Sequence, residues 1–330
     1  MTSTLPSSLD GVSEQLDVSL QQVQDFIDND LLSGSEAMKP LLDYAAQFQG
    51  KRLRAMTVLL IANGFGKLKQ QHVHVAAYVE MIHAATLMHD DLLDSASQRR
   101  SLDCVHVKWG SHAAVLLGDW MYSSAFGSAT FMDDQTASRV LADATKRVCR
   151  GEIEQNLSRG NFNLSAEDYL SHIDGKTAAL FDAAAFLAAH YAGASPKDCQ
   201  SMSSFGLLAG RAFQIADDLL DVAGDEGVVG KSLGTDLGNG KLTLPLMRLR
   251  DNLSETEATQ LEKMFGDEKN CDANLAAMWP EAWAITAEQT RGELRGYIDS
   301  AVSHLDCLPD SDYANVLRDI TYFLGDRELK

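Results

Sequence analysis

Apolar side chains recur along this chain at spacings of three and four residues, which is the period of an α-helix with one buried face. Seven stretches show this spacing, at residues 16–27, 56–61, 76–93, 113–126, 140–153, 178–192 and 205–222. The stretch 178–192 is apolar nearly all round, which is typical of a helix enclosed by others. No sustained two-residue alternation and no Asn-Gly or Asp-Gly hairpin signal is present, so the pattern predicts no sheet.

Short interruptions separate these stretches. Loops are expected at 64–66, 161–163, 193–196 and 224–240, where Gly, Asn and Pro gather. No long linker, repeat or low-complexity segment divides the chain. We therefore predict an all-α protein, a single large helical bundle formed by one domain over residues 1–330, in which residues 1–40 form an N-terminal helical segment.

Composition narrows the class of protein. The 330 residues include 28 Lys and Arg against 47 Asp and Glu, a formal charge of −19. An apolar fraction of 45% excludes a mainly disordered chain, and the acidic balance argues against nucleic acid as a partner. The five cysteines form no CxxC pair, and no apolar run is long enough to span a bilayer, so no integral membrane segment is expected. Without a recognisable secretory signal, the expected location is cytoplasmic.

Two matching aspartate clusters carry the strongest chemical signal. Asp90, Asp91 and Asp94 lie in MHDDLLD, and Asp217, Asp218 and Asp221 lie in QIADDLLD, each at the end of an apolar helical stretch. Side chains four residues apart on a helix are neighbours, with Cβ atoms roughly 5–6 Å apart. Carboxylates crowded in this way repel each other unless a cation lies between them, and oxygen-only ligands favour Mg²⁺. Two such clusters facing each other could hold several Mg²⁺ ions around one diphosphate.

The few basic residues are concentrated where a diphosphate would need them. Lys51, Arg52 and Arg54 fall within five positions, and Arg99-Arg100 follows the first aspartate cluster. Lys176, Lys231 and Lys241 each stand apart from other cations. Arg and Lys are the usual ligands of phosphate groups in proteins.

These residues together resemble the all-trans isoprenyl diphosphate synthases of the polyprenyl synthetase family, most closely the long-chain polyprenyl enzymes. From about residue 41 onward the chain carries seven motifs in the family's order: GKRLR (50–54), EMIHAATLMHDDLLDSASQRR (80–100), GDWMYSSAF (118–126), GEIEQ (151–155), GKT (175–177), FQIADDLLDVAGD (213–225) and GKSLGTDLGNGKLTLPL (230–246). One such motif alone is weak evidence for the family, whereas seven motifs in the family's order are highly specific for it. Ser101 departs from the glycine that usually follows the arginine pair.

The resemblance implies a bundle of mostly antiparallel helices around a deep central cavity, usually a homodimer. It also implies a prenyltransferase that condenses isopentenyl diphosphate with an allylic diphosphate through ionisation, condensation and proton elimination. Its implied ligands for up to three Mg²⁺ ions are Asp90, Asp91, Asp94, Asp217, Asp218 and Asp221. The implied catalytic residues are Asp90, Asp91, Asp94, Lys176, Asp217 and Asp218. The implied ligands of the allylic diphosphate site are Arg99, Lys176, Thr177, Gln214, Lys231 and Lys241. Those of the isopentenyl diphosphate site are Lys51, Arg54, His83 and Arg100.

Product length is expected to depend on residues that precede Asp90 on its helix. Thr86 and Ala85 lie four and five positions before Asp90, Ile82 lies deeper, and Trp120 or Phe126 could form a floor. In short-chain relatives aromatic rings close the tunnel at the first two positions. The small residues here predict an all-trans product longer than geranylgeranyl, with a farnesyl or geranylgeranyl synthase as the alternative.

Two alternative functions, each from another class of protein, stay open. A terpene cyclase shares the aspartate-rich helical site but needs no second diphosphate pocket, and Lys51, Arg54 and Arg100 argue against it. A non-catalytic partner subunit would be expected to lack one aspartate cluster, and here both are complete.

Overall fold

A computed structural model describes residues 11–32, 35–48, 50–100, 102–223, 234–267, 269 and 273–325. Its α-helices are α1 Ser13–Leu31, α2 Lys39–Ala45, α3 Leu53–Gly64, α4 Gln70–Leu93, α5 Val105–Trp109, α6 Ser111–Ala129, α7 Thr136–Leu157, α8 Ala166–Ile173, α9 Ala179–Ala192, α10 Pro196–Ala223, α12 Thr235–Gly238, α13 Leu244–Asn252, α14 Glu255–Met264, α15 Leu275–Met278, α16 Pro280–Ser303 and α17 Asp312–Gly325. Single helical turns are η2 Glu36–Met38, η3 Ala46–Phe48, η4 Asp174–Ala178 and η6 His304–Cys307. The predicted all-α class is confirmed.

Helix α9 lies at the centre of the bundle. It packs against α10, α3, α7 and α4, and its alanine-rich sequence is buried on almost every side, as its pattern predicted. Small residues permit this close packing. A Cβ atom on Gly210 of α10 would lie 2.5 Å from the Cα atom of Ala178, so only glycine fits there.

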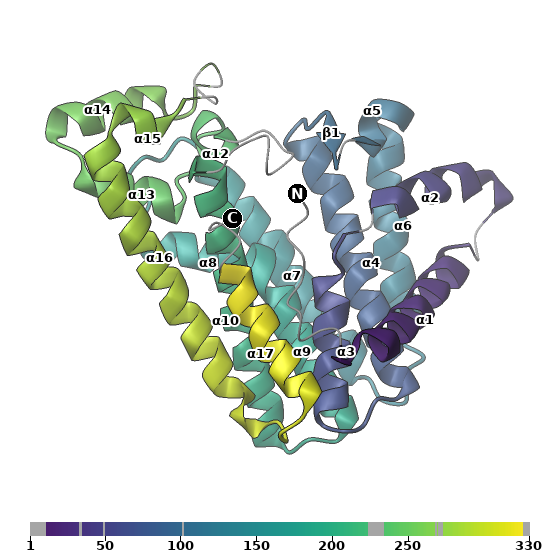
Figure 1. Cartoon of the computed structure of the whole chain (residues 1–330). Helices are drawn as coiled ribbons and strands as arrows, with labels where there is room; N and C mark the ends of the chain where they lie inside the picture. The colour runs from purple at the N-terminus through teal and green to yellow at the C-terminus, as the bar shows by residue number, and fades with distance from the viewer. Residues whose placement is uncertain are drawn as a thin grey trace.

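The aspartate clusters lie at one end of the bundle. Helices α4 and α10 run lengthwise through the molecule, and their C-terminal ends point to the same side, near α12 and β1 (Figure 1). The same end also contains a β-hairpin that the sequence did not predict. Its two antiparallel strands, of two residues each, are β1 Gln98–Arg99 and β2 Leu102–Asp103. Arg100, next to β1, has a φ of 53° and so adopts the left-handed conformation. This conformation is more usual for Gly or Asn than for Arg, so the sequence did not indicate a turn here.

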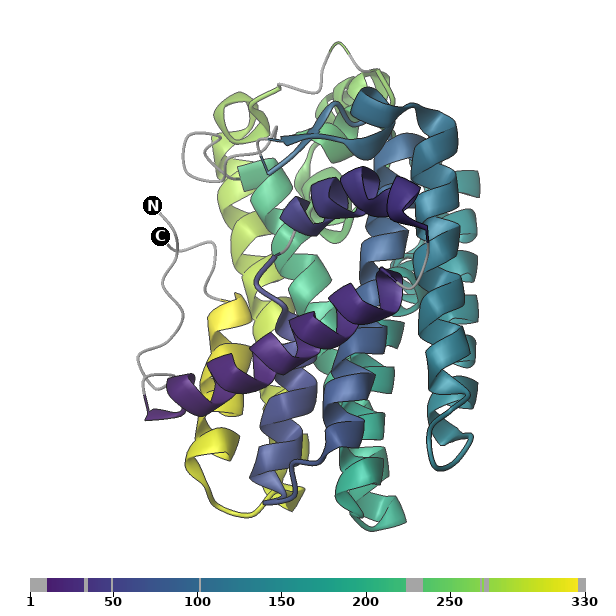
Figure 2. The ribbon, with the colours of Figure 1, turned by 90° about the vertical axis from the view of Figure 1, so that its right-hand side faces the viewer.

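The N-terminal helices form a separate layer. In Figure 2, α1 runs obliquely across α3 and α4, and α2 lies above it, in front of the same bundle. Leu16 and Val23 of α1 are buried against the bundle. Among the described residues, no helix is long and apolar enough to cross a membrane.

Candidate active site

The first aspartate cluster caps α4. Asp91 is 4% exposed and accepts three hydrogen bonds of 2.7–2.9 Å from the guanidinium of Arg99. Within the described part of the chain, Asp90 has no such arginine partner. Burial raises the pKa of Asp90 to about 6, with Glu152 and Asp94 adding to the rise and Lys176 opposing it.

Two cationic side chains from distant parts of the chain contact Asp94. Nη2 of Arg159 lies 2.5 Å from its Oδ1 atom, and Nζ of Lys241 lies 3.4 Å from both carboxylate oxygens. Burial alone would raise the pKa of Asp94, but Lys241, Lys176 and Arg159 together hold it below its usual value. The Nε atom of Arg159 is buried and has no hydrogen-bond partner among the described residues. The guanidinium therefore has donor capacity left for an anion.

The second cluster lies on the last turns of α10. Asp218 is 4% exposed and accepts hydrogen bonds from Tyr169 (2.6 Å) and Gln214 (2.7 Å). Burial raises the pKa of Asp218 to about 7, because the two hydrogen bonds only partly offset burial and the charges of Asp217 and Asp221. Asp221 accepts hydrogen bonds from the Thr235 hydroxyl (3.0 Å) and the Asp236 backbone N–H (3.1 Å).

Asp236 is a fourth carboxylate of this cluster. Burial, followed by the charges of Asp221, Asp218 and Asp217, raises its pKa well above the usual value, and Lys241 opposes the shift. Lys241 therefore interacts with both clusters, because it also contacts Asp94. Sequence reasoning missed Asp236, although it lies inside the motif GKSLGTDLGNGK.

Lys176 projects from an unusual turn. The segment η4 Asp174–Ala178 is a π-helix, a feature often found at functional sites. Nζ of Lys176 lies 2.5 Å from Glu152, 3.2 Å from the Gln155 amide oxygen and 3.9 Å from Asp90. Burial would lower the pKa of Lys176, but Asp90 and Glu152 raise it above its usual value, so the ammonium stays charged.

The glycines of the GEIEQ and GKT motifs bring this turn against α7. A Cβ atom on Gly151 would lie 2.5 Å from the Lys176 backbone nitrogen, and one on Gly175 would lie 2.7 Å from the Arg147 carbonyl oxygen. The adjacent Thr177 donates a 2.6 Å hydrogen bond to Gln214. Lys176, Thr177 and Gln214, which the resemblance assigns to the allylic diphosphate site, thus lie close together.

The four residues expected to bind isopentenyl diphosphate line one cavity of about 820 Å³, together with Phe213. Arg54 is 8% exposed, its guanidinium lies 4.5 Å from the Phe181 ring centre, and its Nε atom has no partner among the described residues. Burial and the charges of Arg54, Arg99 and Arg100 hold the pKa of His83 well below its usual value, so its imidazole is neutral at pH 7. Arg100 donates a hydrogen bond to the Phe48 carbonyl.

The residues assigned to chain length lie on a different face of α4. Thr86 is half-buried one turn before Asp90, whereas Ile82 and Ala85 are fully buried in the core. None of the three lines the 820 Å³ cavity. The Trp120 indole donates to the Leu31 carbonyl on α1, while the Phe126 ring stacks on Tyr122.

One site residue predicted from the sequence cannot be placed, and two residues of the site were not predicted from the sequence. Lys231 lies outside the described residues. Arg159 and Tyr169 were missed because no motif marks them, and their role depends on contacts with residues 65 and 49 positions away in the chain.

An all-helical bundle with two acidic clusters, half-buried cations between them and a neighbouring cationic cavity defines the isoprenyl diphosphate synthase class of fold. The polyprenyl synthetase family model matches residues 35–281, and the chain belongs to this family.

Relatives and solved structures cover most of the chain. It is 32% identical to the octaprenyl diphosphate synthase of Escherichia coli K12, over 86% of this chain and 88% of that protein. It is also 32% identical to heptaprenyl diphosphate synthase component 2 of Geobacillus stearothermophilus, over 94% of this chain and 99% of that protein. The crystal structure of a decaprenyl diphosphate synthase from Rhodobacter capsulatus superposes with a TM-score of 0.89 and 31% identity, over 97% of this chain and 99% of that one.

Proposed function

We propose that this chain is a long-chain trans-prenyltransferase, which adds isopentenyl units to an allylic diphosphate to give a product longer than geranylgeranyl. Family membership and the octaprenyl, heptaprenyl and decaprenyl names of its relatives support this function. The observation that carries it is the position of Lys241, which contacts Asp94 of the first aspartate cluster and interacts with Asp236 beside the second.

We further propose Mg²⁺ as the cofactor. Among the described residues, no three His, Cys, Asp or Glu side chains are placed to hold a metal ion by themselves. The donors nevertheless fit Mg²⁺, which binds through one or two carboxylates and fills its other positions with water and substrate phosphates. Asp90 and Asp218, whose pKa values are raised by burial, would hold up to three such ions together with the other four aspartates. When bound, Mg²⁺ would neutralise charge on the leaving diphosphate.

The protein's own residues would position the two substrates. Lys176, Arg159 and Lys241 would bind the allylic diphosphate and stabilise the negative charge that develops as its C–O bond breaks. Lys51, Arg54 and Arg100 would bind isopentenyl diphosphate, with neutral His83 as a hydrogen-bond partner. Thr177, Gln214 and Phe213 would lie beside the reacting carbons and exclude water. The proton lost after condensation would pass to the released diphosphate, so no side-chain base is assigned.

A homodimer is also proposed. Apolar residues are exposed on one stripe of α7, where Ile153 is 59% and Leu157 is 82% exposed, and on neighbouring α6, where Leu116 is 66% exposed. Helices α6 and α7 pack against each other, so these residues can form one surface. A second copy of the chain could cover such a surface in a two-fold interface.

The test is an elongation assay. The purified chain would be incubated with labelled isopentenyl diphosphate, Mg²⁺ and dimethylallyl, geranyl, farnesyl or geranylgeranyl diphosphate, and the dephosphorylated products would be sized. We expect a ladder that extends beyond geranylgeranyl. Release of diphosphate without elongation would instead indicate a cyclase, and no turnover from any primer would indicate a non-catalytic subunit.

A further inference from the structure

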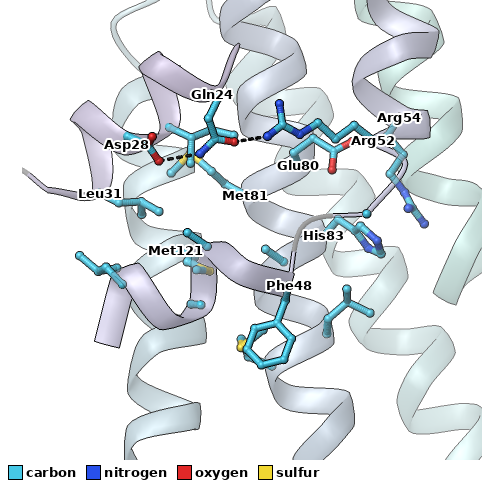
Figure 3. A pocket seen from close by; sticks show the side chains of 18 of the residues that line it. Gln24, Asp28, Leu31, Phe48, Arg52, Arg54, Glu80, Met81, His83 and Met121 are labelled. Atoms are coloured by element: carbon cyan, nitrogen blue, oxygen red, sulfur yellow. Dashed lines mark hydrogen bonds between the residues drawn. The ribbon is translucent and has the colours of Figure 1, made fainter. Parts of the chain in front are cut away.

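The 820 Å³ cavity is much larger than its expected five-carbon substrate requires. It lies between the N-terminal layer of α1 and α2 and the helices α3 and α4, and its two ends differ in chemistry (Figure 3). Volumes of about 300–1,000 Å³ are typical of sites for drug-sized ligands. Isopentenyl diphosphate at the cationic end would leave the other end unfilled.

The cationic end is built for a diphosphate. Arg54 offers a buried Nε without a partner among the described residues, and Lys51 and Arg100 line the same wall. Two acidic residues also line the cavity. Glu80 accepts a 3.0 Å hydrogen bond from the Ala55 backbone and interacts with Arg54 and Arg100, so it offsets part of their charge. Asp28 accepts a hydrogen bond from Gln24.

The opposite end is mainly apolar. Its walls are formed by Ile27 and Leu31 of α1, Leu42 of α2, Met121 of α6, and Ala84, Leu87 and Met88 of α4. Asp28 of α1 and Lys39 and Asp43 of α2 also line the cavity. The α4 residues follow the three- and four-residue spacing of one helix face. This face differs from the stripe of Ile82, Thr86 and Asp90, to which we assign product length.

We propose that this cavity binds a long-chain prenyl diphosphate, with its diphosphate on Arg54, Lys51 and Arg100 and its hydrocarbon chain in the apolar end. The inference rests on the proposed function, because the ligand is then the enzyme's own class of product. A bound product would occupy the isopentenyl diphosphate site and inhibit elongation competitively.

Binding would be measured by calorimetry in EDTA, so that the aspartate clusters cannot hold a diphosphate through a cation. The probes are isopentenyl diphosphate, the non-ionising S-thiolo analogue of geranylgeranyl diphosphate, and geranylgeraniol, which has no diphosphate. We expect the C20 analogue to bind at least tenfold more tightly than isopentenyl diphosphate and to compete with it. Geranylgeraniol should bind at least tenfold more weakly than the C20 analogue.

Two variants fill the apolar end from opposite walls. We call the ratio of the affinity for the C20 analogue to the affinity for isopentenyl diphosphate the C20 advantage. Ile27→Trp on α1 and Ala84→Phe on α4 should each reduce this ratio to less than threefold. The affinity for isopentenyl diphosphate should stay unchanged within threefold. Val18→Trp is the matched control, because Val18 is 56% exposed on α1 and does not line the cavity. Circular dichroism would confirm that each variant is folded.

The inference is overturned if the C20 analogue binds no more tightly than isopentenyl diphosphate, if the two bind together, or if both filling variants keep the C20 advantage. Wild-type elongation activity would be measured on the same preparation. Activity without the C20 advantage would reject this inference alone, whereas absence of activity with every primer would reject the proposed function.

Discussion

Asp94 shows how much a single residue depends on partners far away in the chain. Its carboxylate is held by Arg159 and Lys241, which are 65 and 147 positions distant. Hydrogen bonds that involve charged groups contribute about 1.5–3 kcal/mol. Arg159 thus contacts an aspartate that is proposed to hold a metal, and its buried Nε atom has no partner among the described residues.

Replacing Arg159 should therefore weaken allylic substrate binding. For Arg159→Gln we expect kcat/KM for the allylic diphosphate to fall about tenfold, in line with the loss of one charge-assisted hydrogen bond. Steady-state kinetics at saturating isopentenyl diphosphate measure this. Arg150→Gln is the control, because Arg150 is exposed on α7 and forms an ion pair at 3.8 Å with Glu154, which belongs to neither aspartate cluster. Equal losses in the two variants would contradict a specific role for Arg159.

The raised pKa of Asp218 predicts a pH-dependent stability. Because this pKa is about 7 in the folded protein and about 3.9 in an unfolded chain, the folded state binds more protons between these values. In EDTA, the free energy of unfolding should therefore fall as the pH rises from 5 to 7 and stay low above it. Asp218→Asn should remove this penalty, raising stability at pH 8 while abolishing elongation. Urea unfolding at pH 5 and 8 tests this, and a variant less stable than wild type at pH 8 would contradict it.

At the scale of single elements, α4 presents different chemistry on different faces. One face lines the cavity through Ala84, Leu87 and Met88, and another carries Thr86 one turn before Asp90. The sequence predicted this helix and the position of its aspartates. It could not show that Ala85 is fully buried in the core, because burial depends on the helices that pack around it.

Product length should respond to the Thr86 stripe and not to the cavity face. Thr86→Phe should shorten the longest product by at least one isoprene unit, and Ala85→Phe should do so at a cost of about 1–3 kcal/mol in stability, because its site is already filled. Ala84→Phe, on the cavity face, should leave product length unchanged. Product sizing by reversed-phase chromatography tests all three, and shortening by Ala84→Phe alone would move the tunnel to the other face.

The π-helical turn η4 depends on the glycine that packs it against α7. Gly175→Ala should lower both the melting temperature and kcat, because the new Cβ would lie 2.7 Å from the Arg147 carbonyl oxygen and displace Lys176. Gly127→Ala is the matched control in α6, where a Cβ meets nothing within 4 Å. It should be neutral or stabilise by up to about 1 kcal/mol, since alanine is the better helix former. Thermal unfolding and kinetics measure both, and wild-type values for Gly175→Ala would contradict the packing argument.

At the scale of the whole molecule, the exposed stripe on α7 predicts the assembly state. Leu157→Glu should shift a dimer towards the monomer, because a charge would be buried at the proposed interface. Sedimentation velocity at micromolar concentration measures this. Ile285→Glu is the control, since Ile285 is 52% exposed on α16 and lies outside the stripe. A wild-type monomer, or a dimer untouched by Leu157→Glu, would contradict the interface.

The sequence by itself determined the helices and the two aspartate clusters, because helical periodicity and four-residue spacing are local properties. The motif order further indicated the family and the chemistry. Only the tertiary structure decided that Arg159 reaches Asp94, that Asp236 joins the second cluster, and that an apolar extension adjoins the cationic cavity. These features depend on helix packing, which brings distant residues together and sets the burial that shifts their pKa values.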